Sequence, residues 1–198
     1  MQSIAKGKYK YITYLIGAME ITAEGDCGGT KREKIAEELF ARNVFAIDPT
    51  SMESIRTGMS TKELSDKLVG WMASGHWEEF DKYMNTIWRG KTIIEDIDGR
   101  PNITLYPGDI HYVEVSDWIT ALYNRGDKPC GTFFEAGYAY KLNKPIYLIT
   151  DCAKKELPKN FIGWVDNSGG AIFPNKTQYF NFIDGKYELK RVDAINGK

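Results

Sequence analysis

Short apolar runs alternate with segments of helical periodicity along this chain. The runs are rich in β-branched and aromatic residues, which is typical of strands. They predict strands at residues 9–17, 44–47, 118–123, 145–149 and 171–173, and Asp48-Pro49 is interpreted as the end of the second strand. Because strands and helices alternate, we expect an α/β fold in which helices flank a mainly parallel sheet of about five strands. Ligands are then expected at the carboxyl ends of the strands.

The segment from residue 51 to residue 107 differs in character, and we interpret it as an insertion in a single domain that spans residues 1–198. Apolar residues at helical spacing predict helices at 61–72 and 76–88. The turn-rich stretch 91–107 is compatible with a hairpin. Two interpretations stay open, because the insertion could cover the site or could be a structural helical pair without any contact to ligand.

A glycine-rich loop follows the first predicted strand. Thr30 and Glu33 fit a capping box, so a helix is expected to follow Thr30. Such a loop can direct backbone N–H groups at a phosphate or a sugar, although an ordinary connection between a strand and a helix explains the pattern equally well. Near the C-terminus, residues 177–192 are interpreted as a hairpin that turns at Asp184-Gly185.

Composition and charge exclude several classes of function. The formal net charge is −1, so no basic excess favours binding to a nucleic-acid polymer. No apolar stretch reaches the roughly 18 residues of a membrane helix, and residues 1–10 lack a signal-peptide core. Three cysteines without C-x-x-C spacing and two distant histidines argue against disulfides and metal sites. We therefore expect a cytoplasmic protein with no membrane partner.

The stretch from Ser116 to Asp151 carries the candidate chemistry. It predicts a βαβ unit in which Glu135 lies in the first turn or two of the helix. The positive end of that helix is expected to keep the carboxylate ionised, which suits a nucleophile. A second carboxylate, for which Asp117 is the candidate, can transfer protons. Two such groups suffice to cleave a glycosidic bond with retention, through a covalent glycosyl intermediate.

Several motifs in this region resemble the nucleoside 2-deoxyribosyltransferase family, which includes nucleotide N-glycosidases. The resemblance covers residues 9–50 and 109–165. The motifs are Y-L-I-G-A-M-E, D-C-G-G-T-K-R, D-I-H-Y-V-E-V-S-D-W-I-T-A-L-Y, G-T-F-F-E-A-G-Y-A, K-P-I-Y-L-I and P-K-N-F-I. The resemblance implies a flavodoxin-like sheet and an enzyme that cleaves the bond between a ribose or deoxyribose and a base, without a metal or organic cofactor.

The resemblance also implies roles for individual residues. Glu135 matches the nucleophile that attacks the anomeric carbon, and Asp117 matches an aspartate that assists proton transfer. Asn160 matches an asparagine that a neighbouring subunit contributes, which implies a homo-oligomer. Asp109 matches an aspartate at the start of the preceding helix, where capping would explain it. The residues expected to bind substrate are Gly17, Met19, Glu20, Arg32, Asp109, Asp127, Gly131, Thr132 and Asn160.

The chain departs from the family pattern at three places. Pro129 stands where many transferases have an aspartate that touches the base, and Asp127 lies two positions earlier. The chain ends in Asn196-Gly197-Lys198 without the aromatic residue of the transferases, and the insertion is unusually long. The identity of the base and the choice between transfer and hydrolysis stay open.

Three functions remain after these departures. The first is transfer of a 2-deoxyribosyl group from a nucleoside to an acceptor base. The second is hydrolysis of a nucleoside 5′-monophosphate, with Lys31, Arg32 or Thr132 as partners of the phosphate. The third is a non-catalytic nucleotide-binding module on the same fold, because a fold does not fix a function.

Overall fold

The computed structural model describes residues 9–18, 29–89, 108–128 and 130–191. Within these residues five parallel strands form one sheet in the order β2-β1-β3-β4-β5. The strands are β1 (Tyr11–Gly17), β2 (Val44–Ile47), β3 (Trp118–Tyr123), β4 (Ile146–Thr150) and β5 (Ala171–Phe173). This is the strand order of the flavodoxin-like fold, and the predicted fold class is therefore confirmed.

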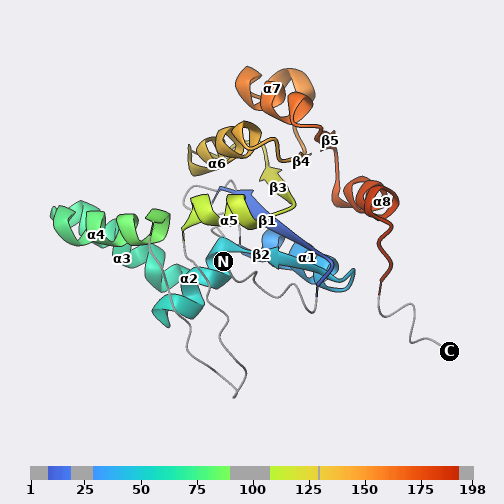
Figure 1. Ribbon diagram of the computed structural model, residues 1–198. Coiled ribbons are helices and arrows are strands. Elements are labelled where there is room, and N and C mark those ends of the chain that lie inside the picture. The colour runs from blue at the N-terminus through green and yellow to red at the C-terminus, as the bar shows by residue number, and fades with distance from the viewer. Residues whose placement is uncertain (1–8, 19–28, 90–107, 129, 192–198) are drawn as a thin grey trace, which may run out of the picture.

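Helices cover both faces of the sheet (Figure 1). One face packs against α1 (Gly29–Phe40) and α8 (Lys176–Tyr187). The other packs against α5 (Asp109–Val115), α6 (Cys130–Lys141) and α7 (Lys159–Asn167), and a short 3-10 helix, η1 (Lys154–Glu156), precedes α7. Parallel strands require crossover connections, and α1, α6 and α7 supply them.

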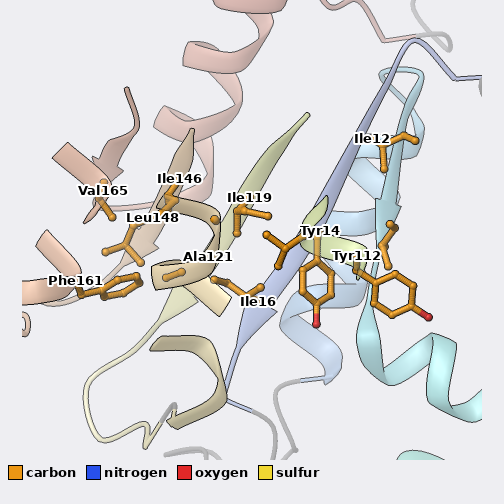
Figure 2. Packing of buried hydrophobic residues seen from close by; sticks show 14 of the residues in the cluster. Ile12, Tyr14, Ile16, Tyr112, Ile119, Ala121, Ile146, Leu148, Phe161 and Val165 are labelled. Carbon is orange, nitrogen blue, oxygen red and sulfur yellow. The ribbon is translucent and has the colours of Figure 1, made fainter. Parts of the chain in front are cut away.

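Two hydrophobic cores result from the alternation of side chains along each strand. In β1, Ile12, Tyr14 and Ile16 lie in the core beneath α5, α6 and α7, whereas Leu15 lies in the core beneath α1 and α8. Figure 2 shows the first core, with the rings of Tyr14 and Tyr112 side by side and apolar residues of β3 and β4 beyond them. Because the strands are buried on both faces, they read as nearly continuous apolar runs in the sequence.

Three helices lie between β2 and α5 in sequence: α2 (Pro49–Thr57), α3 (Thr61–Ser74) and α4 (Trp77–Arg89). Asp48 caps α2, and Ser60 with Glu63 forms a capping box at α3. In Figure 1, α3 and α4 extend to the side of the sheet, and α4 packs against α3 and α5. Leu64 is the only buried side chain among those described in α3 and α4.

The predicted strands and the two predicted insertion helices are confirmed, with β1 beginning at Tyr11. The helix α2 was not predicted, because Asp48-Pro49 was taken only as the end of a strand. Thr30 does not precede α1, which begins at Gly29. The hairpin suggested for residues 91–107 lies outside the described residues. No helix in the described part of the chain is both long and apolar enough to cross a membrane.

The hairpin predicted for residues 177–192 is wrong, because Lys176–Tyr187 forms α8. Asn175 caps this helix by accepting a hydrogen bond from the Gln178 backbone N–H at 3.0 Å. Tyr179, Phe180 and Ile183 are buried at helical spacing against the sheet. This burial outweighs the turn signal of Asp184-Gly185, which lies inside the helix.

Candidate active site

The candidate nucleophile lies where α6 begins, just after the carboxyl end of β3. Glu135 is the sixth residue of α6, and Thr132 lies three positions earlier on the same side of the helix. Both side chains are buried, with relative exposures of 7% for Glu135 and 2% for Thr132. A buried carboxyl group at this edge of a parallel sheet is in the place where such folds bind ligands.

Tyr14 of β1 contacts Glu135 directly. Its phenolic O–H donates a hydrogen bond of 2.6 Å to Oε1 of Glu135. Burial raises the pKa of Tyr14 well above its usual value, and the nearby carboxylates of Asp109 and Glu135 raise it further. The phenol therefore stays protonated and acts as a fixed donor to the Glu135 carboxylate.

Asp109 brings a second carboxylate to Glu135. It is the first residue of α5, and its side chain is half-buried. Asp109 raises the pKa of Tyr14 through both its charge and a side-chain hydrogen bond, so the phenol interacts with two carboxyl groups. The residue before α5 is Gly108, and no side chain caps this helix. Asp109 therefore faces the site instead of capping α5 as expected.

The ionisation of Glu135 differs from the expectation. Burial raises the pKa of Glu135 well above its usual value, and the charge of Asp109 raises it further. The Tyr14 hydrogen bond and the charge of Arg32 act in the opposite direction. The helix terminus does not keep this carboxyl group ionised, because Glu135 lies in the second turn of α6, where the dipole effect is weak. Desolvation is the larger effect.

Arg32 of α1 lies beneath the site and is 1% exposed. Its Nη1 donates to the carbonyl oxygen of Ala18 at 3.1 Å, and its Nε donates to Oδ1 of Asp48 at 3.1 Å. Both acceptors are oxygen atoms of the protein itself and not of a substrate phosphate. Gly17 ends β1 beside this guanidinium, and a Cβ there would lie 3.2 Å from the Leu122 carbonyl oxygen and 3.3 Å from Nη1 of Arg32.

Thr132 carries a hydroxyl group that is well placed for a ligand. Among the described residues, Oγ1 of Thr132 is buried and has no hydrogen-bond partner. A buried hydroxyl without a partner costs free energy, so a ligand oxygen or water that paired with it would be favoured. The N-terminal turn of α6, in which Thr132 lies, also favours negative charge.

The structure places Asp117 at the opposite edge of the sheet from Glu135. Asp117 precedes β3, whereas α6 follows that strand. Its side chain is exposed, and Oδ2 accepts a hydrogen bond of 2.8 Å from the Ile12 backbone N–H near the start of β1. A residue before a strand lies at the amino edge of the sheet, so Asp117, the candidate for the second carboxylate, and Glu135 lie at opposite ends of β3. Asp109 is the acidic residue beside Glu135.

The remaining predicted site residues lie at several places. Asp127 is nearly buried and accepts hydrogen bonds from Asn124 N and Nδ2, at 2.8 and 3.2 Å, which hold the loop after β3. Gly131 is exposed in the first turn of α6, and Asn160 is exposed at the second position of α7. Met19 and Glu20 lie outside the described residues. No three His, Cys, Asp or Glu side chains within the described part of the chain could together hold a metal ion.

Two residues around the site were not found from the sequence. Tyr14 lies within an apolar strand, and its place on the same face as Ile12 and Ile16 was its only signal. Asp48 was interpreted as the end of a strand, although an aspartate before proline is a common start of a helix. Its contact with Arg32 joins positions that lie 16 residues apart in the sequence.

No protein-family model matches the sequence, and no match is found among curated proteins. Among solved structures, the chain is similar to one described as a CMP N-glycosidase from Clostridium botulinum. The sequence identity is 13% and the TM-score is 0.42, and the match covers 87% of this chain and 97% of the other.

Proposed function

We propose that this protein is an enzyme that cleaves the N-glycosidic bond of nucleosides or nucleotides, with Glu135 as the nucleophile. The observation that supports the proposal best is the buried hydrogen bond from Tyr14 to Glu135 with Asp109 beside both groups. Two interacting carboxyl groups that hold one proton between them can supply both a nucleophile and an acid. The sequence motifs that contain Glu135 and Asp109 resemble those of the deoxyribosyltransferase family.

The first step breaks the bond between C1′ of the sugar and the base nitrogen. The carboxylate oxygen of Glu135 forms an ester bond to C1′, and the base leaves with the electron pair of the broken bond. In the reactive form the one proton of the pair lies on Asp109, having passed there from Glu135, and Asp109 gives it to the departing base, which neutralises the charge that develops there. Tyr14 holds the carboxyl group of Glu135 in place through its hydrogen bond to Oε1.

The second step releases the sugar from Glu135. Asp109, now ionised, accepts a proton from the incoming nucleophile as that nucleophile attacks C1′ and breaks the ester bond. Water as the nucleophile gives hydrolysis, and a free base gives transfer. From the sequence, transfer of a 2-deoxyribosyl group was the preferred function. Among the described residues the Thr132 hydroxyl has no partner, and it lies in the first turn of α6. These two features favour the hydrolysis of a 5′-phosphorylated nucleotide, because a phosphate oxygen would accept from this hydroxyl near the positive end of the helix.

The test incubates the protein with ribo- and deoxyribonucleosides and their 5′-monophosphates, with and without a free acceptor base. We expect release of base from a 5′-monophosphate, and no exchange when acceptor is added. Glu135→Ala should lower kcat by about 10³-fold or more, because it removes the nucleophile. Release of base at an unchanged rate by Glu135→Ala would contradict the proposal, and exchange of base would establish transfer. Binding of a nucleotide without turnover would establish the non-catalytic module.

Thr132 has a separate test. Thr132→Val keeps the shape of the side chain and removes the hydroxyl, so KM for a 5′-monophosphate should rise about tenfold while KM for the matching nucleoside stays the same. Thr50→Val is the matched control, because the Thr50 hydroxyl is also buried but donates to Asp48 at 2.8 Å. An equal change of KM for both substrates would contradict a phosphate partner.

We also propose that the enzyme is a homo-oligomer in which Asn160 contributes to the site of a neighbouring subunit. The proposal comes from the sequence resemblance, and the exposure of Asn160 on α7 is compatible with it. Mixing inactive Glu135→Ala with inactive Asn160→Ala should restore activity, because some assembled sites then contain both residues. If the mixture is as inactive as each variant alone, Asn160 does not act between subunits.

A further inference from the structure

A buried ion pair links three segments behind the candidate site. Arg32 and Asp48 have side-chain exposures of 1% and 4%, and Nε of Arg32 lies 3.1 Å from Oδ1 of Asp48. Arg32 comes from α1, Asp48 follows β2, and the Ala18 carbonyl that accepts from Nη1 follows β1. A fully buried arginine needs a function or an exact set of partners, because desolvation of an ion pair often exceeds its Coulombic attraction.

Asp48 is held as firmly as Arg32. Its Oδ1 also accepts from the backbone N–H and the hydroxyl of Thr50, at 3.1 and 2.8 Å, and this caps α2. Asp48 therefore joins the start of α2 to Arg32, and Arg32 joins that point to the end of β1. Gly17 leaves room for this arrangement, since a Cβ there would crowd the guanidinium.

The charges around Glu135 come from three packed elements. Tyr14 of β1 donates a hydrogen bond, Asp109 of α5 adds a negative charge, and Arg32 of α1 adds a positive charge. Within the described part of the chain, Arg32 is the cation that lowers the pKa of Glu135, and it acts against both burial and the charge of Asp109. Its effect is fixed, because its partners Asp48 and Ala18 hold the guanidinium in one place.

We propose that Arg32, held between Asp48 and the Ala18 carbonyl, is a positioning residue that keeps a fixed positive charge behind Glu135 and anchors the backbone at the end of β1. The inference rests on the proposed function, in which Glu135 must be ionised to attack the sugar. Asp48 takes part because it sets both the position and the net charge of the pair. The role assigned to Arg32 differs from a contact with substrate phosphate.

The test removes each charge of the pair in turn and measures kcat/KM against pH. Arg32→Gln removes the cation, so the acid limb of the profile should move up by about one pH unit. Asp48→Asn keeps an acceptor oxygen at the start of α2 but leaves the cation uncompensated, so the acid limb should move down. A purely structural role would lower activity in both variants and leave the limb where it is.

Arg32→Lys separates charge from anchoring. Lysine keeps a positive charge but cannot make both fork contacts of the guanidinium. We expect the acid limb to stay near that of the wild type while kcat/KM falls about tenfold through a misplaced Ala18 backbone. A limb that moves as far as in Arg32→Gln would show that the fixed geometry of the guanidinium, and not only its charge, acts on Glu135.

The chain provides a control in a second, partly buried ion pair. Arg42 is 8% exposed, and its Nε donates to Oδ1 of Asp184 at 2.8 Å on the side of the sheet covered by α1 and α8. Arg42→Gln and Asp184→Asn remove the same charges from a similar contact that does not face Glu135. Neither variant should move the acid limb, although both should lower the melting temperature.

A readout without turnover separates this inference from the proposed function. In protein labelled with ¹³C-glutamate, the carboxyl signal of Glu135, assigned by its loss in Glu135→Gln, reports the titration directly. The titration should move up in Arg32→Gln and down in Asp48→Asn even if no substrate is cleaved. An unmoved signal in both folded variants overturns the inference, whereas inactive wild-type protein with the expected movements overturns only the proposed function.

Discussion

At the scale of single residues, the site brings a nucleophile into an environment that opposes its charge. The sequence predicted Glu135 in the first turn or two of a helix. The structure confirms this position and shows that the side chain is buried. Its raised pKa could not be predicted, because it depends on burial by other elements and on the charge of Asp109, which comes from α5. Asp117 was placed at the wrong edge, because the motif suggested a partner but not the direction of the strand.

The raised pKa of Glu135 predicts a stability that depends on pH. The folded protein binds the Glu135 proton more tightly than the unfolded chain, so its contribution is fully present below the usual glutamate pKa and is lost as pH rises through the folded pKa. Glu135→Gln removes this loss, and the melting temperature at pH 8 should rise by about 3–5 °C. The increase should disappear near pH 4 in thermal denaturation.

The control for this prediction has the opposite sign. A hydrogen bond from Arg42 lowers the pKa of Glu38, so Glu38→Gln should lower the melting temperature at pH 8 or leave it unchanged. A Glu135→Gln variant that is less stable than the wild type at pH 8 would show that the carboxylate is favourably bound in the fold. Burial would then not dominate its ionisation.

Tyr14 offers a second prediction at this scale. Tyr14→Phe removes the hydrogen bond to Oε1 of Glu135, which raises the pKa of Glu135 further. We expect kcat/KM to fall about tenfold or more and the acid limb of its pH profile to move up. Tyr179→Phe is the control, since Tyr179 is buried on the other face and shares a 2.7 Å hydrogen bond with Thr120. It should lower stability without moving the limb.

At the scale of elements, the sequence predicted the strands and helices whose apolar pattern is visible within the element itself. Apolar runs identified all five strands within the described residues, and apolar spacing identified α3 and α4. The helix α8 was mistaken for a hairpin because a dipeptide favoured a turn, whereas contacts of Tyr179 and Ile183 with distant strands favour the helix. The start of α2 was missed because its cap, Asp48, also ends the connection from β2.

The connection between α7 and β5 provides a prediction about a close approach of elements. A Cβ at Gly170 would lie 1.9 Å from the Ile146 carbonyl oxygen, which belongs to the backbone of β4 and cannot move freely. Gly170→Ala should therefore lower the free energy of unfolding by about 3 kcal/mol or more. Gly163→Ala, in the middle of α7 with nothing within 4 Å of its Cβ, should raise it by up to about 1 kcal/mol. Urea denaturation measures both changes.

At the scale of the whole molecule, the sheet contributes side chains to a hydrophobic core on each of its faces. This links the site to residues on the opposite face. The strand β1 contributes Tyr14 to the site and Leu15 to the core beneath α1 and α8. Loss of packing on that second face should weaken the shared strands, because neighbouring residues of a strand point to opposite faces. We therefore expect the two faces to unfold together rather than independently.

Ile183→Ala tests this coupling. Ile183 is fully buried in α8, and its truncation should cost about 2–5 kcal/mol. If the sheet is one cooperative unit, hydrogen exchange of the slowest amides in α6 should accelerate by the factor that corresponds to this loss, although α6 lies on the other face. Val69→Ala is the control, because Val69 is 61% exposed on α3 and should change α6 exchange very little. Acceleration confined to α8 and β5 would mean that the site is supported by its own face alone.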